Sequence, residues 1–272
     1  MDVTFYEKRL KPTIRRLMPR SVKPHRILAG PLRGRIIVTS WHDYPGAILG
    51  RTERALLEWF GRNVREGETW LDVGAHYGYT AIALSELVGS QGRVFAFEPV
   101  LSTAGYLGRT RAINHLAQLR VLPLGLGDSD VLEVRRVPVV RGMADSTLHP
   151  PDAWIEPCLV VGLDSLWRGI CDDQPRVDGV KIDVQGMELQ AMRGMAAILR
   201  EFTPKLVVEL HHGVDRVEFL DCLVSLGYSR LGSPIEPASS EADPAYLNDR
   251  SYYFKPVPVP ESRRVTSPST AT

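Results

Sequence analysis

Residues 70–99 read WLDVGAHYGYTAIALSELVGSQGRVFAFEP, and the fold class follows from them. Thr69 to Val73 is a short run of mainly apolar residues, typical of a buried strand. Two glycines follow, and Tyr79 to Leu87 then has the composition of a helix. Arg93 to Glu98 repeats the pattern of the first strand. Strand, tight turn, helix and strand in this order predict a unit with two parallel strands.

The same alternation of strands and helices continues to Tyr228. We expect further buried strands at Leu119–Leu124, Gly179–Val184 and Lys205–Leu210, and helices at Leu101–Ala117, Glu188–Arg200 and Val214–Leu226. Such repeats pack as a mostly parallel sheet with helices on both faces. The sequence therefore predicts an α/β, doubly wound, Rossmann-like fold. In this architecture a ligand binds beyond the carboxyl ends of the strands.

The loop after the first strand, DVGAHYGYT at residues 72–80, has the features of a ligand-binding turn. Its glycines permit a tight turn and a close approach, and the helix that follows offers N–H groups at its start. The dinucleotide pattern G-x-G-x-x-G does not fit, because His76 and Thr80 occupy the second and third glycine positions. A carboxylate before the loop could accept a hydrogen bond from the ammonium group of an amino acid. We expect the cofactor to contact Asp72, Gly74, Ala75, His76 and Gly78.

Two more acids follow later strands. Glu98 lies twenty residues after Gly78, the spacing at which an acid meets ribose hydroxyls. An amino-acid part, a ribose and a close backbone together describe S-adenosylmethionine. The alternative is that the glycines only form a turn and Glu98 is solvated. Asp128, after the third strand, is a candidate for the adenine amino group, although Gly-Asp in a loop is often just a turn.

Three separated motifs resemble those of the FkbM-type methyltransferases. They are the run at 70–99, VKIDVQGMELQAMRGM at 180–195 and LVVELHH at 206–212, and ILGRTERALLEWF at 48–60 is similar to the helix before the family's core. The resemblance, over roughly residues 47–255, implies a class I methyltransferase that modifies hydroxyl groups of sugars or secondary metabolites in natural-product biosynthesis. It also implies that Asp72, Gly74 and Gly78 contact the methionine part, Glu98 the ribose and Asp128 the adenine. Many relatives read Asp-x-Glu-Gly-x-Glu, whereas here Gln185 replaces the middle acid.

The reaction chemistry is expected at the ends of the fourth and fifth strands. Methyl transfer to a hydroxyl needs close positioning of donor and acceptor and a group that removes the proton. We expect Asp183 to face the acceptor and His211 or His212 to act as the base. Both histidines could instead be surface residues of a loop. A divalent ion on Asp183, Glu188 and Glu209 is an alternative that we do not expect, and Glu188 could simply complement a helix dipole.

The two ends of the chain differ in composition from the centre. Residues 1–62 are read as a basic N-terminal extension with a cap helix, in which Arg35–Thr39 has strand character and Thr52–Val64 is helical. The methyltransferase domain is expected over 63–255, with extra strands at 131–140 and 157–163 in an insertion. Residues 256–272, rich in proline, serine and threonine, are expected to form a disordered tail.

Composition restricts the partners. The 272 residues carry a formal net charge of +1, which argues against a general polyanion binder and makes nucleic acid an improbable partner. Three cysteines without a C-x-x-C pair favour a reducing compartment, and no signal peptide or membrane span is recognised, so we expect a cytoplasmic protein. We expect a small-molecule acceptor with a hydroxyl group. The alternatives are an RNA or protein methyltransferase that docks its substrate on the basic arm, and a non-catalytic binding module; a homo-oligomer stays open.

Overall fold

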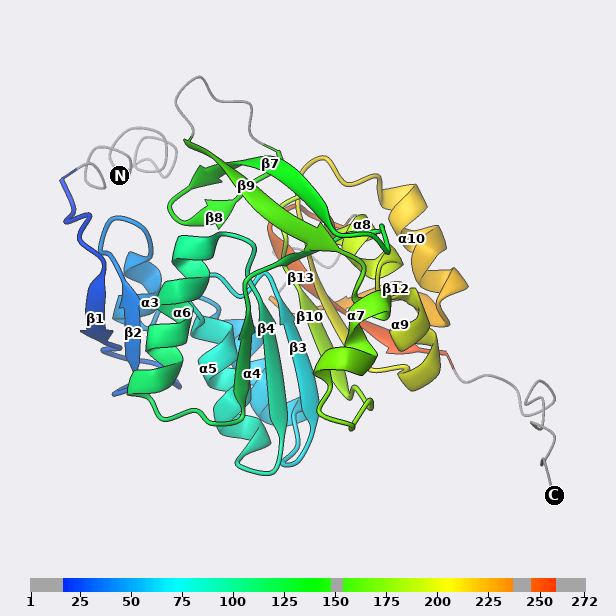
Figure 1. Ribbon diagram of the computed structural model, residues 1–272. Coiled ribbons are helices and arrows are strands. Elements are labelled where there is room, and N and C mark those ends of the chain that lie inside the picture. Colours follow the sequence, from blue (N-terminus) through cyan, green and yellow to red (C-terminus); the bar gives the residue numbers. More distant parts are fainter. Residues whose placement is uncertain (1–16, 148–153, 237–245, 258–272) are drawn as a thin grey trace, which may run out of the picture.

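The computed structural model describes residues 17–147, 154–236 and 246–257. Its centre is a seven-stranded sheet in the order β12-β13-β11-β10-β3-β4-β5 (Figure 1). The strands are β3 (Thr69–Val73), β4 (Arg93–Phe97), β5 (Leu119–Leu122), β10 (Gly179–Ile182), β11 (Lys205–Leu210), β12 (Tyr228–Pro234) and β13 (Arg250–Pro256). The first five in chain order are parallel, whereas β13 pairs antiparallel with both β11 and β12. The fold is therefore the predicted Rossmann-like, mostly parallel α/β architecture, with an antiparallel edge that the sequence pattern did not indicate.

Helices cover both faces of this sheet (Figure 1). They are α4 (Arg54–Asn63), α5 (Tyr79–Val88) and α6 (Leu101–Ile113) on one side, and α7 (Leu163–Ile170), α8 (Glu188–Arg193), α9 (Ala196–Phe202) and α10 (Arg216–Ser225) on the other. Alternate residues of β3 serve the two apolar cores, because Leu71 and Val73 pack toward α7–α10 whereas Trp70 packs toward α4 and α5. The mainly apolar composition of these strands follows from burial on both faces.

A second sheet lies over one end of the first. It has the order β6-β9-β7-β8, with strands β6 (Gly125–Leu126), β7 (Glu133–Val140), β8 (Met143–Ala144) and β9 (Trp154–Val161). The long antiparallel pair β7–β9 confirms the extra strands expected in the insertion. Figure 1 shows this sheet above the large one, where it can cover a site at the ends of the large sheet's strands.

The described part of the N-terminal segment is folded onto the domain. Strands β1 (Lys23–Arg26) and β2 (Ile36–Thr39) form an antiparallel pair, followed by α3 (Pro45–Leu49). The Val38 N–H donates to Thr110 Oγ1 in α6 at 2.9 Å, and Ile27 and Ile37 are fully buried. This segment therefore contributes to the core, which its basic composition did not suggest. Lys8, Arg9, Lys11, Arg15 and Arg16 lie outside the described residues.

Other differences from the expected elements are local. The helix expected at 188–200 divides into α8 and α9 at Gly194 and Met195, and Gly194 lies against another loop, where a Cβ would be 1.7 Å from the Gly127 carbonyl oxygen. Pro256 belongs to β13, and the rest of the expected tail from residue 258 lies outside the described part. Cys158, Cys171 and Cys222 are free thiols. Among the described helices none combines the length and apolarity needed to cross a bilayer.

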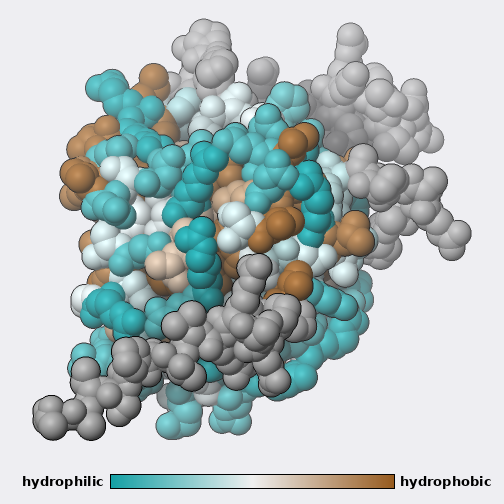
Figure 2. All heavy atoms as spheres, turned by 90° about the vertical axis from the view of Figure 1, so that its right-hand side faces the viewer, coloured by the Kyte–Doolittle hydropathy of each residue, from teal (hydrophilic) through white to brown (hydrophobic). Residues whose placement is uncertain are grey.

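Hydrophilic side chains cover most of the face shown in Figure 2, the right-hand side of Figure 1 where α10 lies. Apolar residues on this face occur in small groups among polar ones. Scattered apolar groups of this kind are ordinary for a protein surface and mark no site.

One glycine connects the centre of the large sheet to the loops at the carboxyl ends of its strands. Gly74, directly after β3, has φ +79°, and a Cβ there would lie 1.8 Å from the carbonyl oxygen of Asp183. The loop after β3 and the loop after β10 can therefore approach each other only if residue 74 has no side chain.

We predict that Gly74→Ala destabilises the fold far more than Gly67→Ala. Gly67 has a nearly identical φ of +82° but nothing within 4 Å of a built Cβ, so its substitution costs only backbone strain, about 1 kcal/mol. Gly74→Ala adds a clash with backbone and should cost at least about 3 kcal/mol. Urea unfolding monitored by circular dichroism measures both. Equal losses in the two variants would contradict the packing role of Gly74.

Candidate active site

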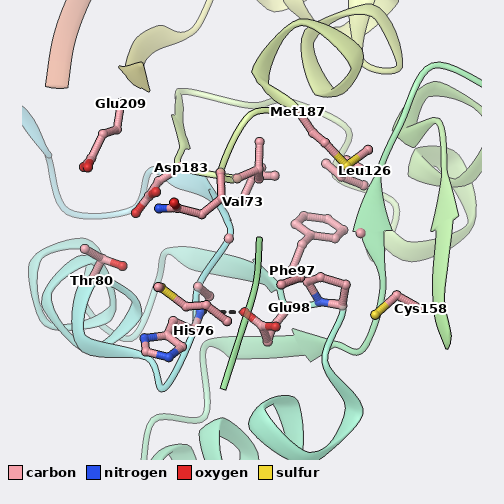
Figure 3. A pocket seen from close by; sticks show the side chains of 18 of the residues that line it. Val73, His76, Thr80, Phe97, Glu98, Leu126, Cys158, Asp183, Met187 and Glu209 are labelled. Atoms are coloured by element: carbon pink, nitrogen blue, oxygen red, sulfur yellow. Dashed lines mark hydrogen bonds between the residues drawn. The ribbon is translucent and has the colours of Figure 1, made fainter. Parts of the chain in front are cut away.

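A cavity of about 210 Å³ opens at the carboxyl ends of the parallel strands (Figure 3). Its walls come from the ends of β3, β4, β10 and β11, from the inserted sheet and from residues before α4. The predicted residues on the wall are Gly74, Ala75, His76, Glu98 and Asp183. Asp72, Gly78, Asp128, His211 and His212 are not among the residues that line it.

Asp72 lies beneath the cavity. Its side chain is fully buried, accepts a hydrogen bond from Thr80 Oγ1 at 2.7 Å and lies 3.2 Å from Lys181 Nζ. Lys181 also contacts Asp183 Oδ2 at 3.3 Å and donates to the Gly74 carbonyl at 3.1 Å. Burial disfavours the Lys181 charge, but Asp72 and Asp183 outweigh it and raise the pKa of the ammonium group. Asp72 thus balances a buried cation and holds the loop from below.

The glycines of the loop serve packing within the protein. Gly74 adjoins the backbone of Asp183, as described above, and a Cβ on Gly78 would lie 2.1 Å from Leu107 Cδ1 of α6. The N–H groups of Gly74 and Ala75 both donate to the Phe97 carbonyl at 3.0 Å. The absence of a side chain at Gly78 lets α6 approach, and its absence at Gly74 lets the loop after β10 approach, while Gly74 also lines the cavity.

Glu98 lies on the wall at the end of β4, where sequence spacing predicted it. Its Oε2 accepts the His76 N–H and its Oε1 accepts the Val100 N–H, each at 2.9 Å (Figure 3 draws the first). Only 3% of Glu98 is exposed, and burial raises the pKa of its carboxyl to about 8. A carboxylate oxygen can accept more than one hydrogen bond, so both oxygens retain capacity for hydroxyl donors in the cavity.

His76 is held in one orientation and is uncharged. Burial lowers the pKa of its ring to about 4, and its Nε2–H donates to the Arg141 carbonyl at 3.0 Å. Its ring packs against Tyr44 and Tyr77 with centroid distances of 5.0 and 4.3 Å, and the Tyr77 hydroxyl donates to Asp43 at 3.0 Å. These contacts fasten the turn between β7 and β8 to the first loop, which closes one side of the cavity.

Asp128 lies away from the cavity wall. It is partly exposed and pairs with Arg135 of β7 at 3.4 Å, so the loop acid takes part in a surface ion pair. The wall near Glu98 is instead largely apolar and is formed by Phe97, Pro99, Gly125, Leu126, Val137, Met143, Cys158 and Val160. A flat, apolar group such as a purine ring would fit this surface better than a charged one.

The opposite end of the cavity is acidic. Asp183 and Glu209 both line it, from the ends of the neighbouring strands β10 and β11 (Figure 3). Burial opposes the charge of Asp183, but Lys181 and His211 keep the pKa of its carboxyl below the usual value. Burial and the nearby Asp183 raise the pKa of Glu209. Environments that separate the pKa values of two carboxyl groups are a feature of acid–base sites.

The two histidines differ sharply. His211 is 2% exposed, its Nδ1 lies 2.5 Å from Glu188 Oε1, and its Nε2 lies 2.7 Å from the Gln185 amide. Burial disfavours the ring's charge, but the hydrogen bonds with Glu188 and Glu209 outweigh it and raise its pKa to about 10. A ring that already carries a proton is a poor base, so in this state His211 does not match the expected role. His212 is exposed and does not line the cavity.

Several residues of the cavity gave no recognisable signal in the sequence. Glu53, directly before α4, and Tyr44 both line it, and burial raises the pKa of the Glu53 carboxyl to about 8. Glu53 has φ +51°, a conformation that glutamate rarely adopts, and nothing in its neighbours indicates it. Lys181 could have been found, because a lysine inside an otherwise apolar buried strand requires an acidic partner.

Comparison with known proteins gives a family. Residues 72–230, more than half of the chain, match the model of the methyltransferase FkbM domain. A search of curated protein sequences finds no match. Among solved structures, an FkbM methyltransferase from Methylobacillus flagellatus is similar at 19% identity and a TM-score of 0.46, over 72% of this chain and half of that protein's length. An S-adenosylmethionine-dependent O-methyltransferase from Thermotoga maritima is similar at 14% identity and a TM-score of 0.48, over 83% of this chain and 74% of the other.

We predict that Glu98 makes stability fall as pH rises. Its carboxyl has a pKa of about 8 in the folded chain and about 4.3 when unfolded, so between these values the folded state keeps a proton that the unfolded state has lost. The stabilising contribution is complete below about pH 4 and is lost as pH rises through 8, at up to about 1.4 kcal/mol per pH unit.

Glu98→Gln should remove this slope, because glutamine has no proton to lose. Urea unfolding of both proteins at pH 5.5, 6.5 and 7.5 measures the difference in unfolding free energy. The exposed Glu201→Gln serves as control and should leave the slope unchanged. A difference between wild type and Glu98→Gln that stays constant across these pH values would contradict the buried, protonated carboxyl.

Proposed function

The chain belongs to the FkbM methyltransferase family, and we propose that this S-adenosylmethionine-dependent enzyme methylates a hydroxyl group of a small molecule, a sugar or secondary metabolite. One observation carries the proposal. A single cavity has Glu98 and an apolar wall at one end and the carboxylates of Asp183 and Glu209 at the other. The first end suits an adenosyl group, and the second suits an acceptor that donates hydrogen bonds.

In the proposed complex the cofactor occupies the end near β3 and β4. Glu98 accepts the ribose hydroxyls through the capacity left on its two oxygens. The adenine lies on the apolar wall around Leu126 and Val160, and Gly74, Ala75 and His76 adjoin the methionine part. Three of the expected residues do not contact the cofactor in this arrangement. Asp72 positions Lys181, Gly78 lets α6 pack closely, and Asp128 pairs with Arg135 at the surface.

The acceptor occupies the acidic end, where its hydroxyl faces Asp183 and Glu209. In the transfer the S–CH₃ bond breaks as the O–CH₃ bond forms, S-adenosylhomocysteine leaves, and the hydroxyl proton passes to the carboxylate pair. Glu209 is the better proton acceptor of the two, because Asp183 and burial raise the pKa of its carboxyl. Holding the two reacting atoms in line supplies much of the rate, and His211 positions the pair through its contacts at 3.4 Å with each carboxylate.

We predict that two matched substitutions separate the two ends of the cavity. Glu98→Gln should weaken S-adenosylmethionine binding about 10- to 100-fold, since the amide nitrogen replaces one acceptor oxygen and hydrogen bonds from the ribose hydroxyls are lost. Glu209→Gln should leave that affinity within about threefold and lower methyl transfer at least about 100-fold. Calorimetric titration with S-adenosylmethionine and S-adenosylhomocysteine measures the first effect. If wild type binds neither compound, the proposal fails.

Transfer is followed with trideuteromethyl cofactor and a panel of sugars, glycosides and phenols, by mass spectrometry and NMR of the product. The proposal expects a labelled methyl group on oxygen. A methyl group found only on nitrogen or carbon, with amine and carbon acceptors included in the same panel, would overturn the O-methyl assignment while leaving the cofactor site intact.

A further inference from the structure

We propose that Asp183, Glu209 and His211 bind a divalent transition-metal ion that holds the acceptor oxygen. Among the residues that the structure describes, these three form a group whose donor atoms all lie within 4.8 Å of one another. The inference rests on the proposed function, because the acceptor oxygen is the ligand that the ion would hold. The set differs from the alternative raised from sequence, in which Glu188 was a direct ligand and His211 was not.

The register of the sheet brings the two carboxylates together. Ile182 of β10 pairs with Val208 of β11, so the next residues, Asp183 and Glu209, leave neighbouring strands at the same level. His211 Nε2 lies 3.4 Å from Asp183 Oδ1 and 3.4 Å from Glu209 Oε1. Two donors at right angles around an ion about 2.1 Å away are about 3 Å apart, so only a small contraction is needed.

The second observation is the support behind the histidine. Glu188 is fully buried, and its Oε1 holds His211 Nδ1 at 2.5 Å. A carboxylate on one ring nitrogen fixes the imidazole so that the other nitrogen faces the ion, as is usual at metal sites. Glu188 Oε2 has no hydrogen-bond partner among the described residues. A buried carboxylate of this kind is costly for a structural purpose alone, because a polar core group is normally satisfied on both oxygens.

The balance of charge also favours a cation. Asp183, Glu209 and, behind His211, Glu188 gather at this end of the cavity, and the Lys181 ammonium group that contacts Asp183 is shared with Asp72. Lys181 contacts Asp183 through Oδ2, which leaves Oδ1, the atom nearest to His211, available to an ion. The amide of Gln185 now lies 2.7 Å from His211 Nε2, and the ion would take its place.

The donor set indicates the class of metal. Two carboxylates and one imidazole suit Mn²⁺, Fe²⁺ or Zn²⁺ better than Mg²⁺, which prefers oxygen donors alone. Three protein ligands leave positions open for the acceptor. An ion there would bind the acceptor hydroxyl and favour loss of its proton to solvent water, after which the oxygen attacks the methyl group. With the ion bound, Glu209 is a ligand, and this route replaces the transfer of the proton to Glu209.

Mn²⁺ binding to chelator-treated, full-length protein is measured by electron paramagnetic resonance of the free ion. The visible spectrum of bound Co²⁺ then reports the coordination of an ion at the same site. We expect one ion per chain. Glu209→Gln and His211→Asn should each weaken binding at least about 100-fold, and Glu188→Gln about 10- to 100-fold, since it only positions the ring. Glu53→Gln makes the same change on the wall of the same cavity and should alter affinity less than about threefold.

Calorimetric binding of S-adenosylmethionine accompanies every variant and shows whether it is folded. Absence of stoichiometric Mn²⁺ binding in wild type, or Mn²⁺ affinity that Glu209→Gln leaves unchanged, overturns the ion site. Methyl transfer that survives the chelator at its full rate overturns the role of the ion but leaves the proposed function standing. Loss of cofactor binding in wild type would instead refute the proposed function.

Discussion

A single buried cation fixes the end of the sheet on which the site is built. Lys181 is 3% exposed, and its ammonium group reaches Asp72 in β3, Asp183 after β10 and the carbonyl of Gly74. A charge in such surroundings is tolerated only with close partners, and removal of one partner leaves the others uncompensated. The contacts therefore hold the loops after β3 and β10 in one arrangement. Asp183 can face the cavity with one oxygen because Lys181 holds the other.

Much of this architecture could be predicted from the sequence because it depends on local pattern. The runs at Thr69–Val73 and Lys205–Leu210 match their strands at both ends, since strands buried on both faces are mainly apolar. Glu98 and Asp183 line the cavity as expected, because a residue at the carboxyl end of a parallel strand has few other places to lie. The antiparallel edge, β12 and β13, escaped prediction because mixed polar strands lack a distinctive period.

The roles of individual side chains were harder to predict because they depend on partners that are distant in sequence. Asp72 has the residue type and spacing of a ligand contact, yet Thr80 and Lys181 already occupy its carboxylate. His211 has the chemistry of a base, yet Glu188 turns it into a charged, fixed ring. A sequence gives the kind of group at each strand end. Which neighbour neutralises it is decided by the register between strands.

The register between β3, β10 and β11 explains why one row of side chains is buried and neutralised while the next row faces the cavity. Asp72 pairs directly with Lys181, and Lys181 with Val207, so the first row of side chains is neutralised and buried. Two residues further along the same strands, Gly74, Asp183 and Glu209 form the next row on the same face. In this row the first position must lack a side chain, because the Asp183 carbonyl adjoins it. The second row thus presents two carboxylates to the cavity, with Lys181 below them and the His211 ring beside them. A cavity with that lining favours a positive charge or a hydrogen-bond donor. An acceptor hydroxyl provides the donor, and a metal ion that holds the acceptor oxygen provides the charge.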